Sequence, residues 1–139
     1  MKNYSLYNLS RYPQISILIF NYEKESQLLN STNNFLNQSL KDIQLLFLWR
    51  NKTNLHNYNI VNNISLIDER INIFQYFTTF EESIFSLMNK IRGKFVLFIN
   101  KLIDFDEYQL ESFYNETKGK INNIFEFKVK NETIFLIII

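Results

Sequence analysis

The sequence predicts an α/β domain with a mostly parallel β-sheet flanked by helices and a β-hairpin at its C-terminal end. Short apolar runs rich in β-branched residues recur along the chain, and amphipathic segments of helical period lie between them, at a spacing of roughly 25–30 residues. Hydrophobic residues make up 46% of the chain and charged residues 21%. This balance suits a globular core rather than a disordered chain.

The length of 139 residues corresponds to one domain. We expect residues 1–12 to form a lead-in that Pro13 closes, and residues 13–139 to form a single domain. The sequence stops on an apolar run, without a turn or polar cap, and an unprotected apolar strand is an aggregation hazard. Two interpretations stay open: this last strand pairs inside the sheet, or the natural domain continues and the chain is truncated at its C-terminus.

The first half of the domain is expected to hold two strands and two helices. Residues 15–20 form a nearly continuous apolar run, as strands buried on both faces do. After a polar break, apolar residues at helical spacing predict an amphipathic helix over 24–38. A second buried strand is predicted over 43–49, with a polar loop over 50–54. A short helix is expected within 55–68, where many Asn residues favour fraying.

The second half is expected to alternate in the same way. A third strand is predicted over 71–77 and a fourth over 95–99. Between them, apolar residues at helical spacing indicate a helix over 79–92, which Gly93 terminates. A further helix is predicted over 106–117.

That last helix has two sequence signals at its ends. Asp106 is its expected N-cap, and Gly119 lies just past its last residue. The tail 124–139 is then expected to fold as two strands around the turn 130–132. His56 is interpreted as a solvated loop residue, and the charged residues 68–70 as an ordinary solvated face.

Composition excludes several classes of protein. The formal net charge is +1, so no excess of basic residues indicates nucleic-acid binding. Cysteine is absent, which excludes disulfides and thiolate metal sites. The N-terminal residues lack the apolar segment of a secretory signal, and no apolar run approaches the roughly 20 residues of a membrane span. A soluble protein of the cytoplasm is the resulting expectation.

In parallel sheets covered by helices, ligands bind outside the carboxyl ends of the strands. Here those ends are residues 20–24, 49–54, 77–79 and 100–104. They are the places where the sequence predicts a site.

Three segments carry a resemblance to a known family. Residues 13–19 with Tyr22 and Glu23, residues 36–43, and residues 92–99 are similar to the first strand and turn, the entry to the second strand, and the Gly-led strand of family 2 glycosyltransferases. The resemblance spans roughly residues 13–110 in the right order. It implies a GT-A fold, of the nucleotide-diphospho-sugar transferase type, that binds a nucleotide sugar and transfers the sugar to an acceptor.

The resemblance also implies two aspartate motifs, and both are replaced here. The family binds its nucleotide with an aspartate pair after the second strand, where this chain has Trp49 and Arg50. Its aspartate–any–aspartate motif, which holds Mn²⁺ or Mg²⁺ against the diphosphate, corresponds to Asn100, Lys101 and Leu102. Leu102 cannot ligate a metal and Lys101 would repel one. No residue of the chain is assigned as the catalytic base.

By the same resemblance, the nucleotide would contact Phe20, Asn21 and Tyr22 in the first turn. Tyr22 would pack on the base or seal the strand end. Trp49 and Arg50 would either stack on and pair with a ligand or cover an emptied base pocket.

Asp104 and Asp106 are the only substitutes for the missing metal ligands that the sequence suggests, and Asp106 is also the expected N-cap. Three functions remain in competition. The first is a glycosyltransferase-like domain whose catalytic apparatus is degenerate, a pseudoenzyme. The second is part of an active transferase that uses Asp104 and Asp106. The third is a structural interaction domain that binds a protein partner or its own copy through the apolar C-terminal strand.

Overall fold

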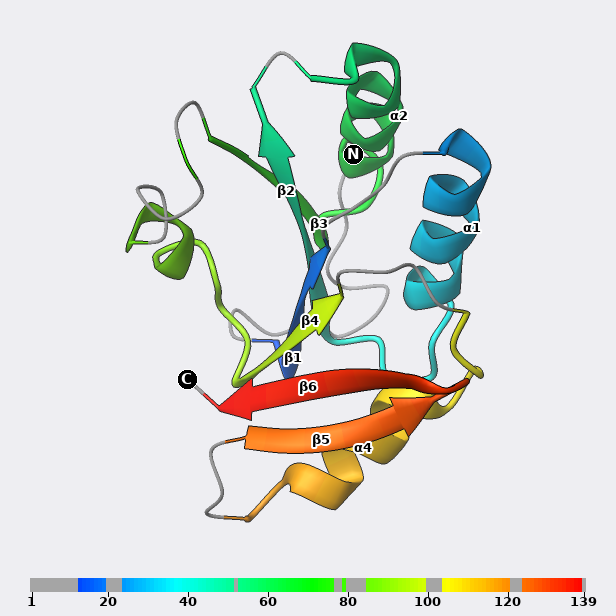
Figure 1. Ribbon diagram of the computed structural model, residues 1–139, viewed down its shortest axis with the longest axis vertical. Coiled ribbons are helices and arrows are strands. Elements are labelled where there is room, and N and C mark those ends of the chain that lie inside the picture. The colour runs from blue at the N-terminus through cyan, green and yellow to red at the C-terminus, as the bar shows by residue number, and fades with distance from the viewer. Residues whose placement is uncertain are drawn as a thin grey trace.

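The computed structural model describes residues 13–19, 24–51, 53–76, 79, 85–99, 104–120 and 124–138. A mixed sheet of six strands forms its centre, with helices packed against it (Figure 1). The predicted α/β class, with a mostly parallel sheet and a C-terminal hairpin, is therefore confirmed. Within these parts of the chain, none of the helices is both long and apolar enough to cross a bilayer.

Most predicted elements are present, with bounds shifted by a few residues. The strands are β1 (Ile15–Ile19), β2 (Ile43–Arg50), β3 (Ile71–Tyr76), β4 (Phe95–Ile99), β5 (Ile124–Val129) and β6 (Glu132–Ile138). The helices are α1 (Glu25–Leu36), α2 (Leu55–Ser65) and α4 (Gln109–Thr117), and residues 85–88 are also helical. The short helix expected within 55–68 thus forms as α2.

The strands lie in the order β3-β2-β1-β4-β6-β5. The first four are parallel, whereas β6 runs antiparallel to both β4 and β5. The chain builds outward from β1 through β2 to β3 and then crosses to the other side of β1 for β4. The order of the parallel strands therefore reverses between β1 and β4, which makes this position the topological switch point of the sheet.

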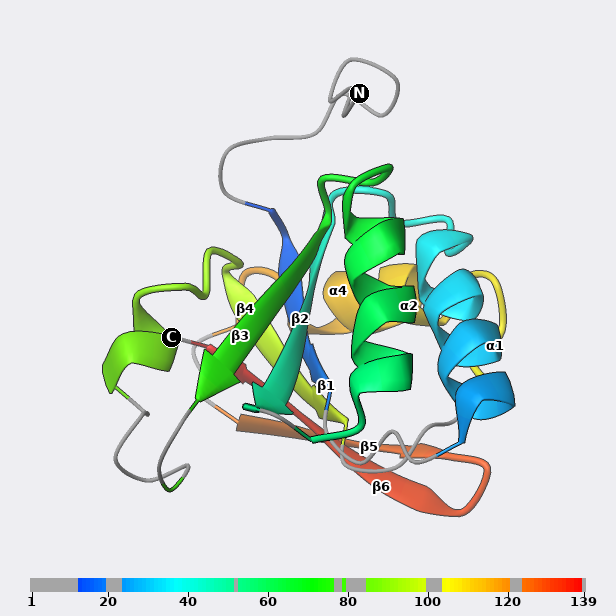
Figure 2. The same cartoon turned by 90° about the horizontal axis from the view of Figure 1, so that it is seen from above.

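Helices α1, α2 and α4 cover one face of the sheet (Figure 2). Alternate strand residues such as Ile17, Phe47 and Leu97 point to this face and are buried against Phe35 of α1 and Phe113 of α4. Because successive side chains of a strand point to opposite faces, the strand residues between these form a second layer.

That second layer is smaller. It contains Leu18, Leu46, Phe74 and Val96, and it is covered by Leu87 from the helical residues 85–88. The continuous apolar runs are thus explained, because β1 is buried along its whole length on both faces.

Gly93 does not terminate a helix, so that prediction was wrong. The helical residues described in this region end at 88, and Gly93 lies in an extended segment leading to β4. A Cβ atom at Gly93 would lie 2.4 Å from the backbone nitrogen of Ser16. The glycine is needed because the chain passes tightly against β1. Residues 80–84 of the predicted helix lie outside the described residues.

Asp106 is not an N-cap either. Helix α4 begins at Gln109, Tyr108 occupies the N-cap position without a side-chain cap, and Asp106 instead accepts the Gln109 N–H through its backbone oxygen at 3.0 Å. Gly119 does lie just past the end of α4, in the left-handed conformation with φ +77°, as predicted.

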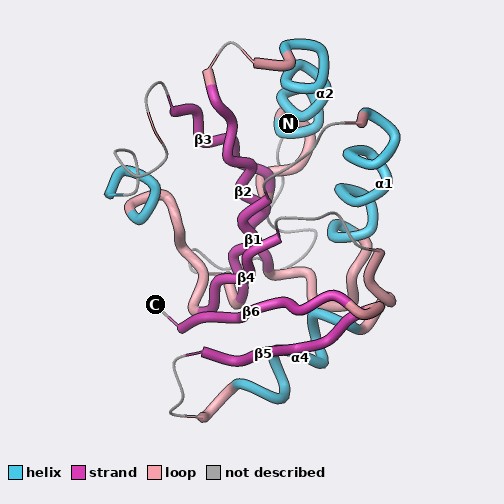
Figure 3. The backbone as a smooth tube through the Cα atoms, in the orientation of Figure 1, coloured by secondary structure: helices cyan, strands magenta, loops and turns pink. Residues whose placement is uncertain are grey.

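The C-terminal strand pairs inside the sheet. Strand β6 lies between β4 and β5 (Figure 3), and a tight turn at Lys130 and Asn131 connects it to β5. The predicted pairing of this strand inside the sheet is therefore confirmed. Residues 135–137 of β6 are paired with β4 on one side and with β5 on the other, so this apolar part of the strand cannot recruit a partner by strand addition.

Candidate functional site

The carboxyl ends of the parallel strands meet at one edge of the sheet, and the N-termini of α1 and α2 begin at the same edge (Figure 1). At the switch point, Ile19 of β1 is in register with Ile99 of β4. The residues that follow these two strands, Phe20, Asn21, Tyr22, Asn100, Lys101 and Leu102, lie outside the described residues. Their predicted roles stay predictions, and the structure describes the site through its remaining members.

Trp49 belongs to the core. Its side chain is only 1% exposed, its indole N–H donates to the backbone oxygen of Thr53 at 2.9 Å, and its ring meets Tyr58 of α2 edge-on at 5.7 Å. The ring therefore fixes the loop after β2 to the start of α2. Covered in this way, it presents no open face to a ligand.

Arg50 lies next to Trp49 but projects differently. It is exposed at the end of β2, and neighbouring residues of a strand point to opposite faces. The structure thus does not bring the two side chains into one pocket.

Asp104 and Asp106 are both exposed and flank the buried Phe105. The side chain of Asn34 in α1 holds this segment by two hydrogen bonds, accepting the Phe105 N–H at 2.8 Å and donating to its carbonyl at 2.6 Å. Gln38 adds a third bond, donating to the Asp106 carbonyl at 2.8 Å. The two carboxylates therefore sit on an anchored segment. Within the described ranges, no three His, Asp or Glu side chains gather at metal-binding distance.

His56 was misinterpreted as a loop residue. It lies in the first turn of α2, and its Nε2 atom is 2.9 Å from the carboxylate of Glu25 in the first turn of α1. Both side chains remain largely exposed, at 73% and 51%. The pair links the starts of two helices at the carboxyl edge. The sequence offered one indication of this contact, because both helices were expected to start at the same edge of a parallel sheet.

A second feature lies away from this edge and was not predicted. A cavity of about 490 Å³ opens on the face that residues 85–88 partly cover, near the amino ends of β2 and β3. Its lining is polar and charged around a small apolar floor, and consists of Gln44, Leu46, Glu69, Asn72, Ile73, Asn89, Lys90 and Arg92.

Gln44 organises this cavity through a fully used amide. Its oxygen accepts from the Ser16 hydroxyl at 2.6 Å and from the Arg92 N–H at 3.1 Å. Its nitrogen donates to the Asn72 side chain and to the Lys90 carbonyl, each at 2.9 Å. The buried glutamine thus ties the segment that carries Lys90 and Arg92 to three strands.

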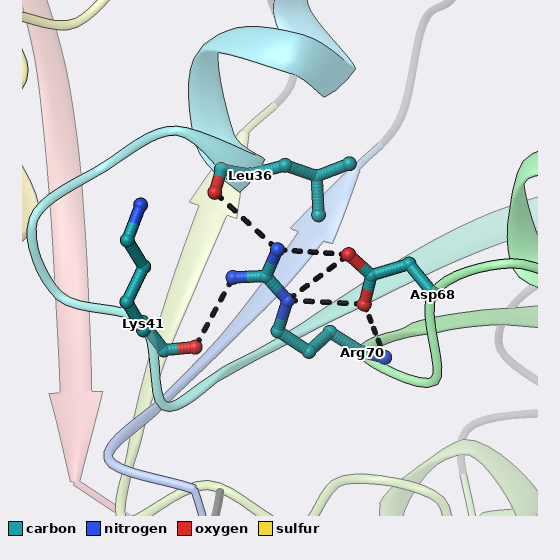
Figure 4. A network of polar contacts seen from close by, with 4 residues as sticks. All are labelled: Leu36, Lys41, Asp68 and Arg70. Atoms are coloured by element: carbon teal, nitrogen blue, oxygen red, sulfur yellow. Dashed lines mark hydrogen bonds and ion pairs between the residues drawn. The ribbon is translucent and has the colours of Figure 1, made fainter. Parts of the chain in front are cut away.

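Arg70 is likewise structural, which corrects its interpretation as a solvated residue. Its guanidinium is 2% exposed and pairs with Asp68 at 2.8 Å (Figure 4). It also donates to the backbone oxygens of Lys41 and Leu36. The Leu36 oxygen belongs to the last turn of α1, whose carbonyls lack helical partners. The charge pair therefore closes the end of α1 against the start of β3.

Comparison with known proteins finds neither a family model nor a curated protein that matches this chain.

Proposed function

We propose that this chain is a degenerate glycosyltransferase-like domain, which keeps a nucleotide-sugar-transferase framework without metal-dependent sugar transfer of its own. The observation that carries the proposal is the burial of Trp49. It occupies the position at which the resemblance to family 2 glycosyltransferases implies a nucleotide-binding aspartate, and there its ring is buried against Tyr58.

The chemistry of sugar transfer supports the same conclusion. The diphosphate of a nucleotide sugar carries concentrated negative charge, which a divalent metal offsets as the sugar leaves. Such a metal prefers carboxylate oxygens. At the corresponding positions this chain offers an amide, a cation and an apolar side chain, namely Asn100, Lys101 and Leu102.

The switch point between β1 and β4 supports retention of the framework. Open α/β sheets bind their ligands at this position, beyond the carboxyl ends of the strands. Helices α1 and α2 both start at this edge, and Glu25 and His56 hold their first turns together.

Thermal unfolding tests the proposal. The chain is melted alone and with uridine or guanosine diphosphate, each with Mn²⁺ or Mg²⁺. A nucleotide at a hundred times its dissociation constant would stabilise the fold by about 2.7 kcal/mol, which corresponds to several degrees at this size. We expect no metal-dependent shift, and no sugar transfer or donor hydrolysis with either diphosphate sugar class.

A metal-dependent shift would contradict the proposal and favour an active site with replacement ligands. The double variant Asp104→Asn/Asp106→Asn then decides whether these carboxylates supply it. Both residues are exposed on an anchored segment, so their amide variants should leave the unfolding midpoint without ligand unchanged. A shift that the double variant abolishes assigns the metal to them.

An interaction domain is the second candidate, and one observation favours it. On the face opposite the three helices, strands β4 to β5 carry exposed large apolar side chains, namely Phe98, Phe135 and Ile124. Binding of a hydrophobic dye to the folded chain, reduced by Phe135→Ser, would support a contact surface here. Absence of dye binding would count against it.

A further inference from the structure

Strand β5 forms one end of the sheet. It pairs with β6 on one side, and the strand order ends there. Among the described residues no strand pairs with its other side, so the backbone groups there are available to a further strand. The apolar end of β6, which the sequence suggested for self-association, has no such edge, because residues 135–137 pair with β4 on one side and with β5 on the other.

The turn decides which residues of β5 direct their backbone groups outward. Lys130 and Asn131 both have positive φ, 49° and 68°, as the central residues of a type I′ turn do. In such a turn the flanking pair, Val129 and Glu132, is hydrogen-bonded across the hairpin. Hydrogen-bonded and non-hydrogen-bonded pairs alternate along an antiparallel ladder. The N–H and C=O groups of Glu126 and Lys128 therefore point away from β6.

Two copies of β5 can pair antiparallel about a two-fold axis in only a few registers. An axis at Glu126 sets this carboxylate opposite its own copy, and an axis at Lys128 sets two ammonium groups together. Like charges directly opposite each other destabilise a strand pair. An axis at Phe127 instead places each Glu126 opposite the Lys128 of the other copy, with both backbone bonds exchanged in each of these pairs.

The side chains suit this register on both faces. Glu126 and Lys128 are exposed on the face away from the helices. Within the described part of the chain, neither is drawn into an ion pair. On the helix-covered face, the half-buried Phe125 would meet the buried Val129 of the other copy, and Phe127 would meet Phe127.

We propose that the chain forms a two-fold symmetric dimer through antiparallel pairing of β5 with β5 of a second copy, in the register that sets Glu126 opposite Lys128. The pairing uses the same edge of β5 in both copies, so no edge of β5 is left for a third copy and the assembly stops at a dimer. It is independent of the proposed nucleotide framework, since β5 lies at the end of the sheet beyond β4 and β6.

Charge reversal tests the dimer and its register. Sedimentation velocity is measured on the full chain, on Glu126→Lys, on Lys128→Glu, on the double reversal, and on an equimolar mixture of the two single variants. We expect the wild type to dimerise and each single variant to do so at least tenfold more weakly, because like charges then meet. The double reversal restores the dimer, and the two single variants pair with each other.

Several results would overturn the proposal. They are a wild type that stays monomeric throughout the micromolar range, single variants that dimerise like the wild type, and a double reversal that does not recover. Circular dichroism and melting of each variant show that the fold is intact. High salt should narrow the differences between variants, since exposed charges are screened.

A cross-link supplies a second test that does not depend on charged variants. The chain has no cysteine, so introduced thiols are the only ones. Non-hydrogen-bonded partners lie about 4.5 Å apart at Cα, within disulfide range. Phe127→Cys should therefore form a covalent dimer under mild oxidation. The matched variant Phe125→Cys should not, because its two copies lie roughly 13 Å apart along the strands. Equal cross-linking of both would refute the register.

Discussion

At the scale of single residues, two buried polar side chains, Arg70 and Gln44, are extensively hydrogen-bonded. Arg70 donates to both carboxylate oxygens of Asp68 and to two backbone carbonyls, and Gln44 uses its amide oxygen and nitrogen twice each. A buried charge or amide is tolerated when every one of its groups is paired. Removing one partner should therefore lower the free energy of unfolding by more than the net contribution of the lost hydrogen bonds, because the other partner stays buried and unpaired.

Arg70→Met should lower the free energy of unfolding by about 3–5 kcal/mol. The substitution leaves the Asp68 carboxylate without its cation and removes the donor that Arg70 supplies to the Leu36 carbonyl, while the Lys41 carbonyl keeps the Ile43 N–H. Urea unfolding measures the loss. The exposed Arg50→Met is the control and should change stability by less than about 0.5 kcal/mol. If Arg70→Met unfolds at the same urea concentration as wild type, the pair is not holding α1 to β3.

Two glutamines give opposite expectations. Gln44→Leu removes the acceptor of the Ser16 hydroxyl and of the Arg92 N–H. It should lower the free energy of unfolding by about 2 kcal/mol or more. The side-chain oxygen of Gln14 is buried without a hydrogen-bond partner among the described residues. Gln14→Met should therefore be neutral or stabilising, because it removes an unpaired group. Urea midpoints of the two variants compare them, and equal destabilisation would contradict the assigned network.

The sequence did not reveal these buried polar residues. Arg70 lies in a charged stretch that is typical of solvent-facing positions, and Gln44 is the single polar residue in the apolar run 43–49. The polar partners of Gln44, namely Ser16, Asn72, Lys90 and Arg92, are 28 to 48 residues away in the sequence. By contrast, the core positions of β1 and β2 were predictable, because a strand buried on both faces leaves a continuous apolar run.

At the scale of elements, the strands were predictable and the ends of the helices were not. Strand identity depends on a local apolar run, whereas α4 starts three residues after the expected Asp106. Long-range contacts of Asn34 and Gln38 hold the Phe105 and Asp106 backbone outside the helix. The prediction that Gly93 ends a helix was wrong for a similar reason. The two roles of glycine, helix termination at Gly119 and close packing at Gly93, have the same appearance in a sequence.

The two glycines provide a matched comparison. Both Gly→Ala substitutions restrict the unfolded chain equally. At Gly119 a Cβ meets nothing within 4 Å, and only the φ of +77° opposes it, at about 1–2 kcal/mol. At Gly93 the Cβ clashes with the backbone of Ile15 and Ser16, so Gly93→Ala should cost about 3 kcal/mol or more. Chemical unfolding of both variants checks the order, and a larger loss at Gly119 would refute it.

At the scale of the whole molecule, the two faces of the sheet are covered unequally. Helices α1, α2 and α4 cover one face (Figure 2). The other face has a small apolar layer, a polar cavity and exposed aromatic side chains. The order of the strands could not be predicted from the sequence, because pairing between strands that are distant in the sequence is not determined by local residue patterns. The switch point, which depends on this order, could be placed only with the structure.

The interior position of β6 has a consequence for the kinetics of folding. The two strands β4 and β6 are adjacent in the sheet but far apart in the sequence, since Phe95 pairs with Ile138. Such a separation raises the contact order and slows the closing step. The β5–β6 hairpin is local and should form within about 1–10 μs, so we expect it to dock onto β4 as a preassembled unit. Until the hairpin docks, the edge of β4 is unpaired and can form hydrogen bonds with another chain. The yield of refolding should therefore fall as the protein concentration rises, because aggregation competes with docking.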